Sequence, residues 1–249
     1  MQNALIENFL HIDDMLVEPN GKAELKKFAK ISKEKEELQN KKEKNKQADM
    51  FKQLFDPKGD EDCDIALMTG CTAHCCIIDE NQKKLYFANA GDSRGVLCKN
   101  GVAYEMSEDH KPDLETEKSR IYKADGWVSD GRVKGRKIIF LIEFFFNFSL
   151  IFLGNLNLSR SLGDLDYKQN KKLPAKEQMI TAYPECKIET LSTDCDFIIL
   201  ACDGVWDCLT NQEICDIVSD KLKKNVKLTK IIEDILDSIL ATDIHNGKF

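Results

Sequence analysis

Hydrophobic and charged residues recur at helical spacing in several parts of this chain. In residues 4–17 (ALIENFLHIDDMLV) apolar side chains fall at positions 5, 6, 9, 12 and 16, which predicts an amphipathic helix. Pro19-Asn20-Gly21 follows directly and is expected to break that helix. Similar spacing predicts three further helices, over 111–124, 211–222 and 228–240.

Shorter apolar runs predict strands. Residues 83–90 (KKLYFANA) are typical of a strand, and the intensely apolar run 195–202 (CDFIILAC) predicts a buried one. The glycine-flanked turn at 91–95 predicts that 96–98 returns as the next antiparallel strand, and Asn100-Gly101 predicts a tight hairpin. Because these strands form meanders and the helices lie elsewhere, the pattern favours an α+β fold.

Residues 21–62 form a strongly charged segment. Its first part, 21–49, contains ten lysines, five glutamates and one aspartate, and the stretch KEKEELQNKKEKNKQ within it is nearly devoid of apolar residues. We interpret the segment as a solvent-exposed helix or a loop. A basic docking surface is the alternative.

A second unusual segment is the apolar run 138–153 (IIFLIEFFFNFSLIFL). As a helix it would span about 24 Å, short of a hydrocarbon core of about 30 Å, so a membrane span is the minor interpretation. If residues 136–154 are removed, the flanking sequence joins into one string, RVKGNLNLSRSLGD. We therefore predict that 136–154 is a hydrophobic insertion, either genuine or a translated intron.

Composition and charge narrow the functional classes. The chain has 249 residues, of which 42% are hydrophobic and 32% charged, as in soluble globular proteins. A formal net charge of -7 argues against nucleic acid as the main partner, because phosphate backbones are bound by basic surfaces. The first ten residues (MQNALIENFL) contain no secretory signal, so we expect the chain in the cytoplasm or nucleus, with membrane association as the minor alternative. We also expect it to be a monomer.

The chain contains ten cysteines and no CxxC pair. Without a secretory signal we expect reduced, buried thiols rather than a disulfide framework or a zinc site.

Three aspartates are candidates for metal binding. Asp203 follows the buried strand, and Asp207 comes four residues later, so a helix there would place both carboxylates on one face. Asp92 lies in the comparable turn after the strand 83–90. A carboxylate beside a dense core is costly to leave unpaired, and oxygen ligands suit Mg²⁺ or Mn²⁺. On spacing alone, ordinary Asp-Gly turns are the alternative.

Four short strings occur in an order that resembles the PPM-type metal-dependent protein serine/threonine phosphatases. They are Gly70-Cys71-Thr72-Ala73, Ala90-Gly91-Asp92-Ser93-Arg94-Gly95, Leu158-Ser159-Arg160-Ser161-Leu162-Gly163-Asp164 and Ile199-Leu200-Ala201-Cys202-Asp203-Gly204-Val205-Trp206-Asp207. Between them lie Asp109-His110-Lys111-Pro112 and Tyr183-Pro184-Glu185, which are also typical of the family. Each string is weak alone, but their joint order is specific.

The resemblance implies a fold and a reaction. The fold is a sandwich of two antiparallel β-sheets flanked by helices, here a single domain over 1–249 that is incomplete at both termini. Two ions, Mg²⁺ or Mn²⁺, with a third in some members, activate a water that attacks the phosphorus of phosphoserine or phosphothreonine in protein substrates. Phosphoproteins are therefore the expected partners.

The resemblance also implies residue roles. Asp203 matches the catalytic metal-ligating aspartate, and Asp92 and Asp207 match aspartates that share an additional metal with it. Thr72 and Arg160 match supporting positions, for which ordinary strand and loop structure remains the alternative. His110 is expected to be a structural loop residue rather than a general acid.

Two departures from the family complicate this assignment. The family's upstream Asp-Gly-His-Gly string and its late Asp-Asn pair are both absent, so Asp203 is the one core metal aspartate expected here. Either the chain is part of an active phosphatase, or it acts as a phosphoprotein-binding or decoy module. A membrane-tethered form through 138–153 is a third interpretation. We predict weak or no activity for these 249 residues.

Overall fold

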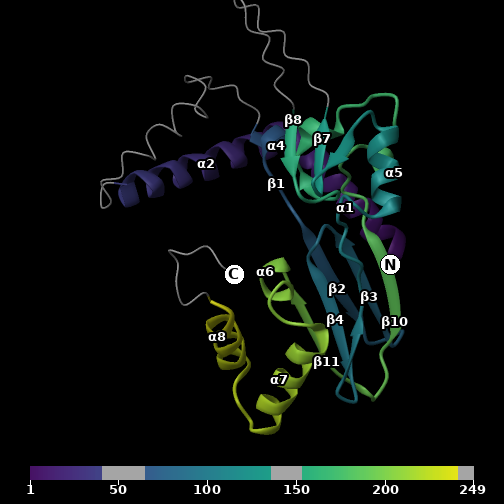
Figure 1. The fold of residues 1–249 in the computed structure, drawn as a ribbon, viewed down its shortest axis with the longest axis vertical. Coiled ribbons are helices and arrows are strands. Elements are labelled where there is room, and N and C mark those ends of the chain that lie inside the picture. Colours follow the sequence, from purple (N-terminus) through teal and green to yellow (C-terminus); the bar gives the residue numbers. More distant parts are fainter. Residues whose placement is uncertain (41–64, 136–152, 241–249) are drawn as a thin grey trace, which may run out of the picture.

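The computed structural model describes residues 1–40, 65–135 and 153–240 (Figure 1). The helices are α1 (Gln2–Val17), α2 (Pro19–Asn40), α4 (Ile65–Met68), α5 (Glu115–Lys123), α6 (Asp203–Trp206), α7 (Asn211–Lys223) and α8 (Leu228–Ile239). The strands are β1 (Gly70–Cys71), β2 (Ala73–Asp79), β3 (Lys84–Ala90), β4 (Arg94–Lys99), β5 (Val102–Glu105), β6 (Trp127–Ser129), β7 (Arg132–Gly135), β8 (Leu153–Leu156), β9 (Leu162–Gly163), β10 (Glu185–Thr190) and β11 (Cys195–Ala201).

The strands form small antiparallel sheets rather than only the two that were expected. Three sheets have three strands each, in the orders β10-β3-β2, β11-β4-β5 and β6-β7-β8, and β1 pairs with β9. This confirms the predicted α+β class. The first two sheets stack face to face, because Leu85 and Phe87 of β3 share one buried cluster with Leu97 of β4.

The predicted pairing of 83–90 with 96–98 is wrong. β3 pairs with β2 and β10, whereas β4 pairs with β11 and β5, so the turn at 91–95 carries the chain from one sheet to the other. Gly91 has φ +126°, a conformation that turns the backbone out of the first sheet. The hairpin at Asn100-Gly101 is confirmed, since both residues have positive φ and β4 pairs with β5.

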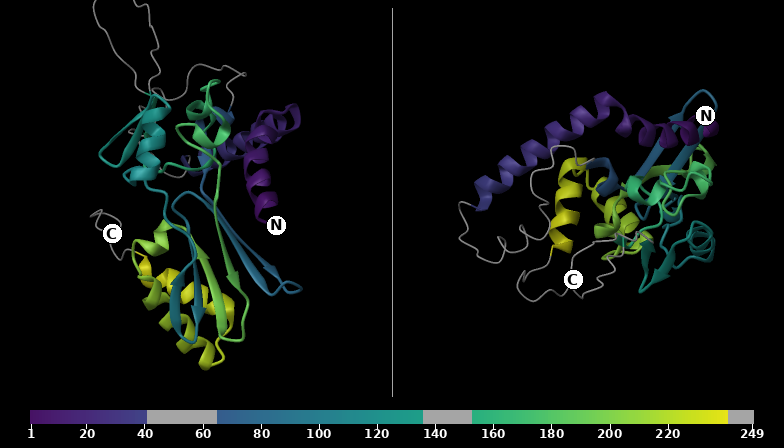
Figure 2. Two further views of the ribbon diagram at one scale, coloured as in Figure 1. Left: turned by 90° about the vertical axis from the view of Figure 1, so that its right-hand side faces the viewer. Right: turned by 90° about the horizontal axis from the view of Figure 1, so that it is seen from above.

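Helices cover the outer faces of the two stacked sheets (Figure 2). Leu5 and Phe9 of α1 pack on Tyr86 and Ala88 of β3, on the side opposite Leu85 and Phe87. This alternation follows from the two-residue period of a strand. On the far side, β4 and β11 pack against α6, α7 and α8, with Ile214, Cys215, Ile231 and Ile235 buried.

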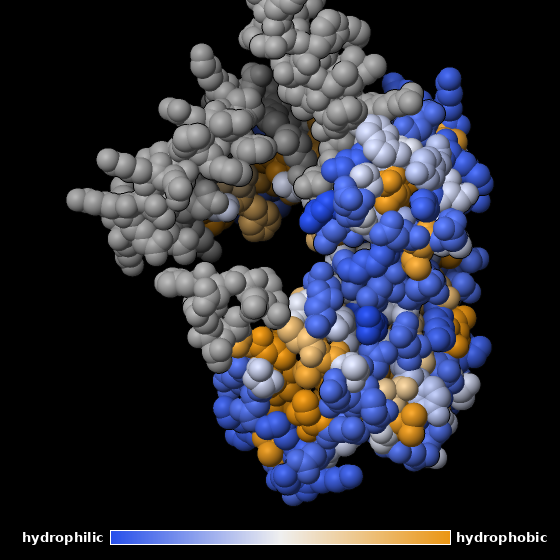
Figure 3. Space-filling model, viewed as in Figure 1, coloured by the Kyte–Doolittle hydropathy of each residue, from blue (hydrophilic) through white to orange (hydrophobic). Residues whose placement is uncertain are grey.

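The predicted helices are present with shifted ends. The helix predicted at 4–17 is α1, and the break at Pro19 is confirmed, because Glu18 is extended and a new helix begins at Pro19. The helices predicted at 211–222 and 228–240 are α7 and α8, and α7 begins with a capping box between Thr210 and Glu213. Apolar side chains remain exposed along α8, at Leu228, Ile232, Leu236 and Leu240 (Figure 3).

A separate layer lies beyond one end of the stacked sheets. There α5 and the sheet β6-β7-β8 enclose a small core of Ile121, Val133 and Ile180. The apolar segment predicted as an insertion leaves from the end of β7. Its residues 136–152 lie outside the described part, while Leu153 and Gly154 begin β8, where Leu153 pairs with Gly135.

The charged segment 21–62 is helical in its first half, as part of α2, and residues 41–64 lie outside the described part. No helix within 1–40, 65–135 and 153–240 has the length and apolar character needed to span a membrane.

Candidate functional site

The motif strings come together around the turn that carries Asp92. Gly91 is pressed between the first and third strings, because a Cβ atom there would lie 2.4 Å from Cγ2 of Thr72 and 3.1 Å from the backbone oxygen of Arg160. Thr72 also shares a hydrogen bond of 2.8 Å with Ser93, the residue after Asp92. Thr72 therefore contacts this turn at both Gly91 and Ser93.

Asp203 and Asp207 lie one helical turn apart. Asp203 begins α6 directly after β11 and Cys202, and the N–H of Asp207 donates to the carbonyl of Asp203 at 2.8 Å. The helix that the sequence suggested at this point is confirmed. Asp203 is half-buried and Asp207 is exposed, whereas Asp92 is 4% exposed.

Lys111 pairs with the most deeply buried of the three aspartates. Its ammonium nitrogen donates to Oδ2 of Asp92 at 2.6 Å. Burial by itself would lower the pKa of Lys111, but the hydrogen bond to Asp92 and the charges of Asp92, Asp203 and Asp207 together raise it. Lys111 is thus the ion-pair partner of Asp92, and the negative charges of Asp203 and Asp207 also favour its protonated form. The sequence analysis did not identify this lysine. Its position in the Asp-His-Lys-Pro string was the available signal.

Arg94 holds α6 against the sheet. Its guanidinium donates to both oxygens of Asp109, at 3.0 and 2.8 Å, and to Asn211 at the start of α7, at 2.7 Å. The same group lies 5.3 Å from the centre of the Trp206 ring, and Trp206 donates to the carbonyl of Ala201. Trp206 is buried, so α6, which begins at Asp203, is fixed from two sides.

The side chain of Arg160 binds Glu117 and the backbone of Tyr183. Its Nη2 and Nε donate to Glu117 at 2.7 and 3.1 Å, and its Nη1 donates to the carbonyl of Tyr183 at 3.0 Å. Glu117, which the sequence analysis also missed, is 1% exposed. Burial alone would raise its pKa, but the hydrogen bond from Arg160 and the charges of Arg120 and Arg160 lower it to about 2.

His110, which the sequence analysis raised, is buried, and His74 is half-buried. His110 accepts a hydrogen bond on Nδ1 from the N–H of Gly91 at 3.2 Å, and burial together with the charge of Arg160 lowers its pKa to about 4. A neutral, buried ring fits the expected loop role. His74 packs edge-on against Phe87, and both of its ring nitrogens are buried without a hydrogen-bond partner.

The three aspartates offer the kind of oxygen ligands that a hard divalent cation prefers, but they do not form a complete binding site. Carboxylate oxygens are the ligands that Mg²⁺ and Mn²⁺ prefer. Among the described residues, however, no three acidic, histidine or cysteine side chains are close enough together to hold a metal ion. Of the three aspartates, Asp92 forms an ion pair with the ammonium group of Lys111.

The cysteines depart from the prediction of buried thiols. All nine in the described ranges are free, but only Cys98 and Cys215 are fully buried. Cys71, Cys202 and Cys208 are exposed, because they lie at strand and helix ends rather than inside the sheets.

The sequence of this chain is similar to those of known proteins. The profile of the family described as protein phosphatase 2C matches residues 5–246. The chain is 43% identical over 180 residues to the probable protein phosphatase 2C 21 of Arabidopsis thaliana, covering 72% of this chain and 45% of that protein. It is 37% identical over 246 residues to the probable protein phosphatase 2C 6 of Paramecium tetraurelia, covering 99% of this chain and 66% of that protein.

The fold is similar to that of a serine-threonine phosphatase 2C from Toxoplasma gondii, with a TM-score of 0.50 and 18% identity, covering 67% of this chain and 52% of that one. The chain spans 45% of the length of the plant relative and 66% of the length of the Paramecium relative. Because the family profile covers nearly the whole sequence, this chain belongs to the protein phosphatase 2C family.

Proposed function

We propose that this chain takes part in the metal-dependent dephosphorylation of phosphoserine and phosphothreonine in proteins. The observation that supports this most directly is the ion pair of Lys111 with Asp92 at 2.6 Å, next to which the charges of Asp203 and Asp207, from a second motif string, also favour the protonated lysine. Asp92 and Asp203 are held at the ends of β3 and β11, in different sheets. Acidic groups gathered in this way are a suitable place for a divalent cation.

Asp203 is the proposed core ligand, with Asp92 and Asp207 as ligands of an additional ion of Mg²⁺ or Mn²⁺. In such sites the bound ions lower the pKa of a water and neutralise charge on the phosphoryl oxygens. The chain's own residues position the carboxylates: Arg94 and Trp206 fix α6, while Thr72 supports the turn at Asp92. Arg160 is proposed as a supporting residue that acts through Glu117, to which it is bound.

The test is a Mn²⁺-dependent assay on a phosphothreonine peptide with the full chain. We expect Asp203→Asn to abolish whatever activity the wild type has, because an amide is a weaker ligand without charge. The matched control is Asp237→Asn, on the exposed side of α8, which should leave activity unchanged. Equal activity of wild type and Asp203→Asn would contradict the proposed role of Asp203.

A second candidate function is phosphoprotein binding without catalysis. It is favoured by the finding that no three potential ligands within the described ranges meet around one point. In that case the chain would bind the phosphothreonine peptide but neither hydrolyse it nor bind Mn²⁺, and calorimetry with each ligand separates the two functions.

The monomeric state stays a prediction. So does the division of the chain into one domain that contains the segments 21–62 and 136–154.

The two stacked sheets are proposed to correspond to the family's β-sandwich. Phosphoproteins are the proposed partners, and the cytoplasm or nucleus is the proposed location.

A further inference from the structure

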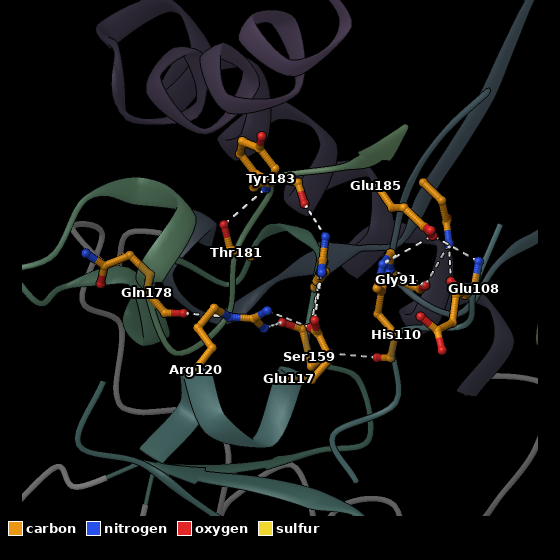
Figure 4. A network of polar contacts seen from close by, with 12 residues as sticks. Gly91, Glu108, His110, Glu117, Arg120, Ser159, Gln178, Thr181, Tyr183 and Glu185 are labelled. Atoms are coloured by element: carbon orange, nitrogen blue, oxygen red, sulfur yellow. Dashed lines mark hydrogen bonds and ion pairs between the residues drawn. The ribbon is translucent and has the colours of Figure 1, made fainter. Parts of the chain in front are cut away.

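Glu117 is the centre of a buried polar cluster on α5 (Figure 4). Its Oε2 accepts from Arg120 at 2.7 Å and from the hydroxyl of Ser159 at 2.6 Å, and its Oε1 accepts from Arg160 at 2.7 Å. A buried carboxylate with two guanidinium partners is strongly held in one position. Nothing in the proposed reaction uses Glu117 directly, so its role needs another explanation.

Ser159 carries the contact from Glu117 towards the turn at Asp92. Its backbone N–H donates to the carbonyl of His110 at 3.2 Å, and its hydroxyl lies 2.8 Å from the same oxygen. Arg120 also donates to the carbonyl of Ser159 at 2.6 Å. Ser159 is fully buried and is therefore fixed between α5 and the loop that contains His110.

His110 in turn holds both backbone groups of Gly91. The backbone N–H of His110 donates to the carbonyl of Gly91 at 3.0 Å, and the ring Nδ1 of His110 accepts from the backbone N–H of Gly91 at 3.2 Å. Asn89 donates to the same carbonyl at 3.0 Å. Since Gly91 has φ +126°, these contacts select a backbone conformation that fixes the direction in which Asp92 leaves the turn.

We propose that Glu117 is a positioning residue for Asp92, acting through Ser159, His110 and Gly91. The inference rests on the proposed function, in which Asp92 holds a metal ion. In metal sites the groups behind the ligands fix ligand orientation, and their removal weakens metal binding by about 10- to 100-fold. Three residues separate Glu117 from Asp92 in this series of contacts. We therefore expect metal binding to weaken by about ten-fold, near the lower end of that range.

The first test needs no metal. Hydrogen exchange of the full chain is followed by mass spectrometry in buffer with a chelator, for wild type, Glu117→Gln and Ser159→Ala. Each variant should lose the stability that about one hydrogen bond contributes. The amides at 89–93 and 108–111 should therefore exchange about five- to ten-fold faster than in the wild type. Ser159→Ala keeps the ion pairs of Glu117, so it remains informative if Glu117→Gln does not fold.

The matched control is Glu189→Gln on β10. Glu189 forms an ion pair with Lys99 at 3.0 Å but belongs to no contact around Asp92. Its variant should leave exchange at 89–93 unchanged. If Glu117 stabilises only the layer formed by α5 and the sheet β6-β7-β8, faster exchange will be confined to α5 and 127–135. Folded variants with normal exchange at 89–93 would overturn the proposal.

The second test measures Mn²⁺ binding by calorimetry on the same proteins. Glu117→Gln and Ser159→Ala should bind Mn²⁺ about ten-fold more weakly than wild type, and Glu189→Gln should not. If wild type binds no Mn²⁺ while exchange at 89–93 still responds to Glu117, the metal-dependent function fails and the positioning contact is supported. Unchanged Mn²⁺ affinity in both folded variants would count against the proposal.

Discussion

The ammonium nitrogen of Lys111 lies 2.6 Å from Oδ2 of Asp92. The Asp92 side chain is 6% exposed and that of Lys111 is 40% exposed, so the lysine reaches inward to a buried carboxylate. A buried charge is costly unless it is paired. Lys111 therefore serves as the counter-ion of this acidic group, and a divalent cation at the same place would have to compete with it or share the carboxylate.

Replacement of Lys111 by methionine should strengthen Mn²⁺ binding and weaken the metal-free fold. The change removes the positive charge that pairs with Asp92 and is favoured by the charges of Asp203 and Asp207, which leaves the Asp92 carboxylate without its counter-ion and available to the metal ion. We expect a gain in Mn²⁺ affinity of about ten-fold and a loss of about 1–3 kcal/mol in the metal-free free energy of unfolding.

Calorimetry and urea unfolding measure the two effects of Lys111→Met. Lys224→Met is the matched control, because Lys224 pairs with Asp220 on the exposed surface of α7. A weaker Mn²⁺ affinity in Lys111→Met would show that the lysine assists the cation rather than competing with it.

Acid should destabilise the metal-free fold in two successive pH ranges. His110 has a folded pKa of about 4 against an ordinary 6.5, so the unfolded chain takes up the proton first and stability falls from pH 6.5 to 4. Glu117 has a folded pKa of about 2 against 4.5, so its contribution is present above pH 4.5 and is lost towards pH 2. Each loss is on the order of 3 kcal/mol.

Urea unfolding across pH measures these losses. In His110→Asn the decline between pH 6.5 and 4 should flatten, and in Glu117→Gln the decline between pH 4.5 and 2 should flatten. The charged groups that face the His110 ring are Arg160, Glu117 and Glu185, and none of them is altered in His110→Asn. Identical slopes in wild type and variants would refute this assignment.

Gly91→Ala should destabilise the protein far more than Gly101→Ala. Both glycines have positive φ, but a Cβ on Gly91 would lie 2.4 and 2.5 Å from side-chain atoms of Thr72, whereas nothing lies within 4 Å of one on Gly101. Gly101→Ala should therefore cost about 1 kcal/mol from backbone strain alone, and Gly91→Ala about 3 kcal/mol or more. Urea unfolding of the two variants is the measurement, and equal losses would contradict the close packing of Thr72 on the turn.

Thiol labelling should separate the cysteines into two classes. Cys98 and Cys215 are fully buried, and burial raises the pKa of the Cys215 thiol to about 12, so neither should react in the native state. Exposed Cys202 and Cys208 should react within minutes at pH 8. Mass spectrometry after labelling with and without urea identifies the sites, and rapid native labelling of Cys215 would show that α7 opens readily from the sheet.

The sequence was sufficient to predict those helices and strands whose pattern of apolar residues lies within one short segment of the chain. The amphipathic spacing in 4–17, 211–222 and 228–240 predicted α1, α7 and α8, and the apolar run 195–202 predicted β11. These elements follow from side-chain periodicity, which depends only on neighbouring residues. The motif strings likewise pointed to Asp92, Asp203 and Asp207 by residue type and order.

Only the tertiary structure decided which strands pair and which charged groups meet. The turn at 91–95 resembled a hairpin, yet β3 pairs with β10, about a hundred residues away in the chain, because its apolar face is buried against the second sheet. Glu117 is one charged residue among several in α5, and it is buried because Arg120 and Arg160 neutralise it there. Strand partners and ion pairs of this kind are chosen by long-range packing, so the local pattern of residues does not specify them.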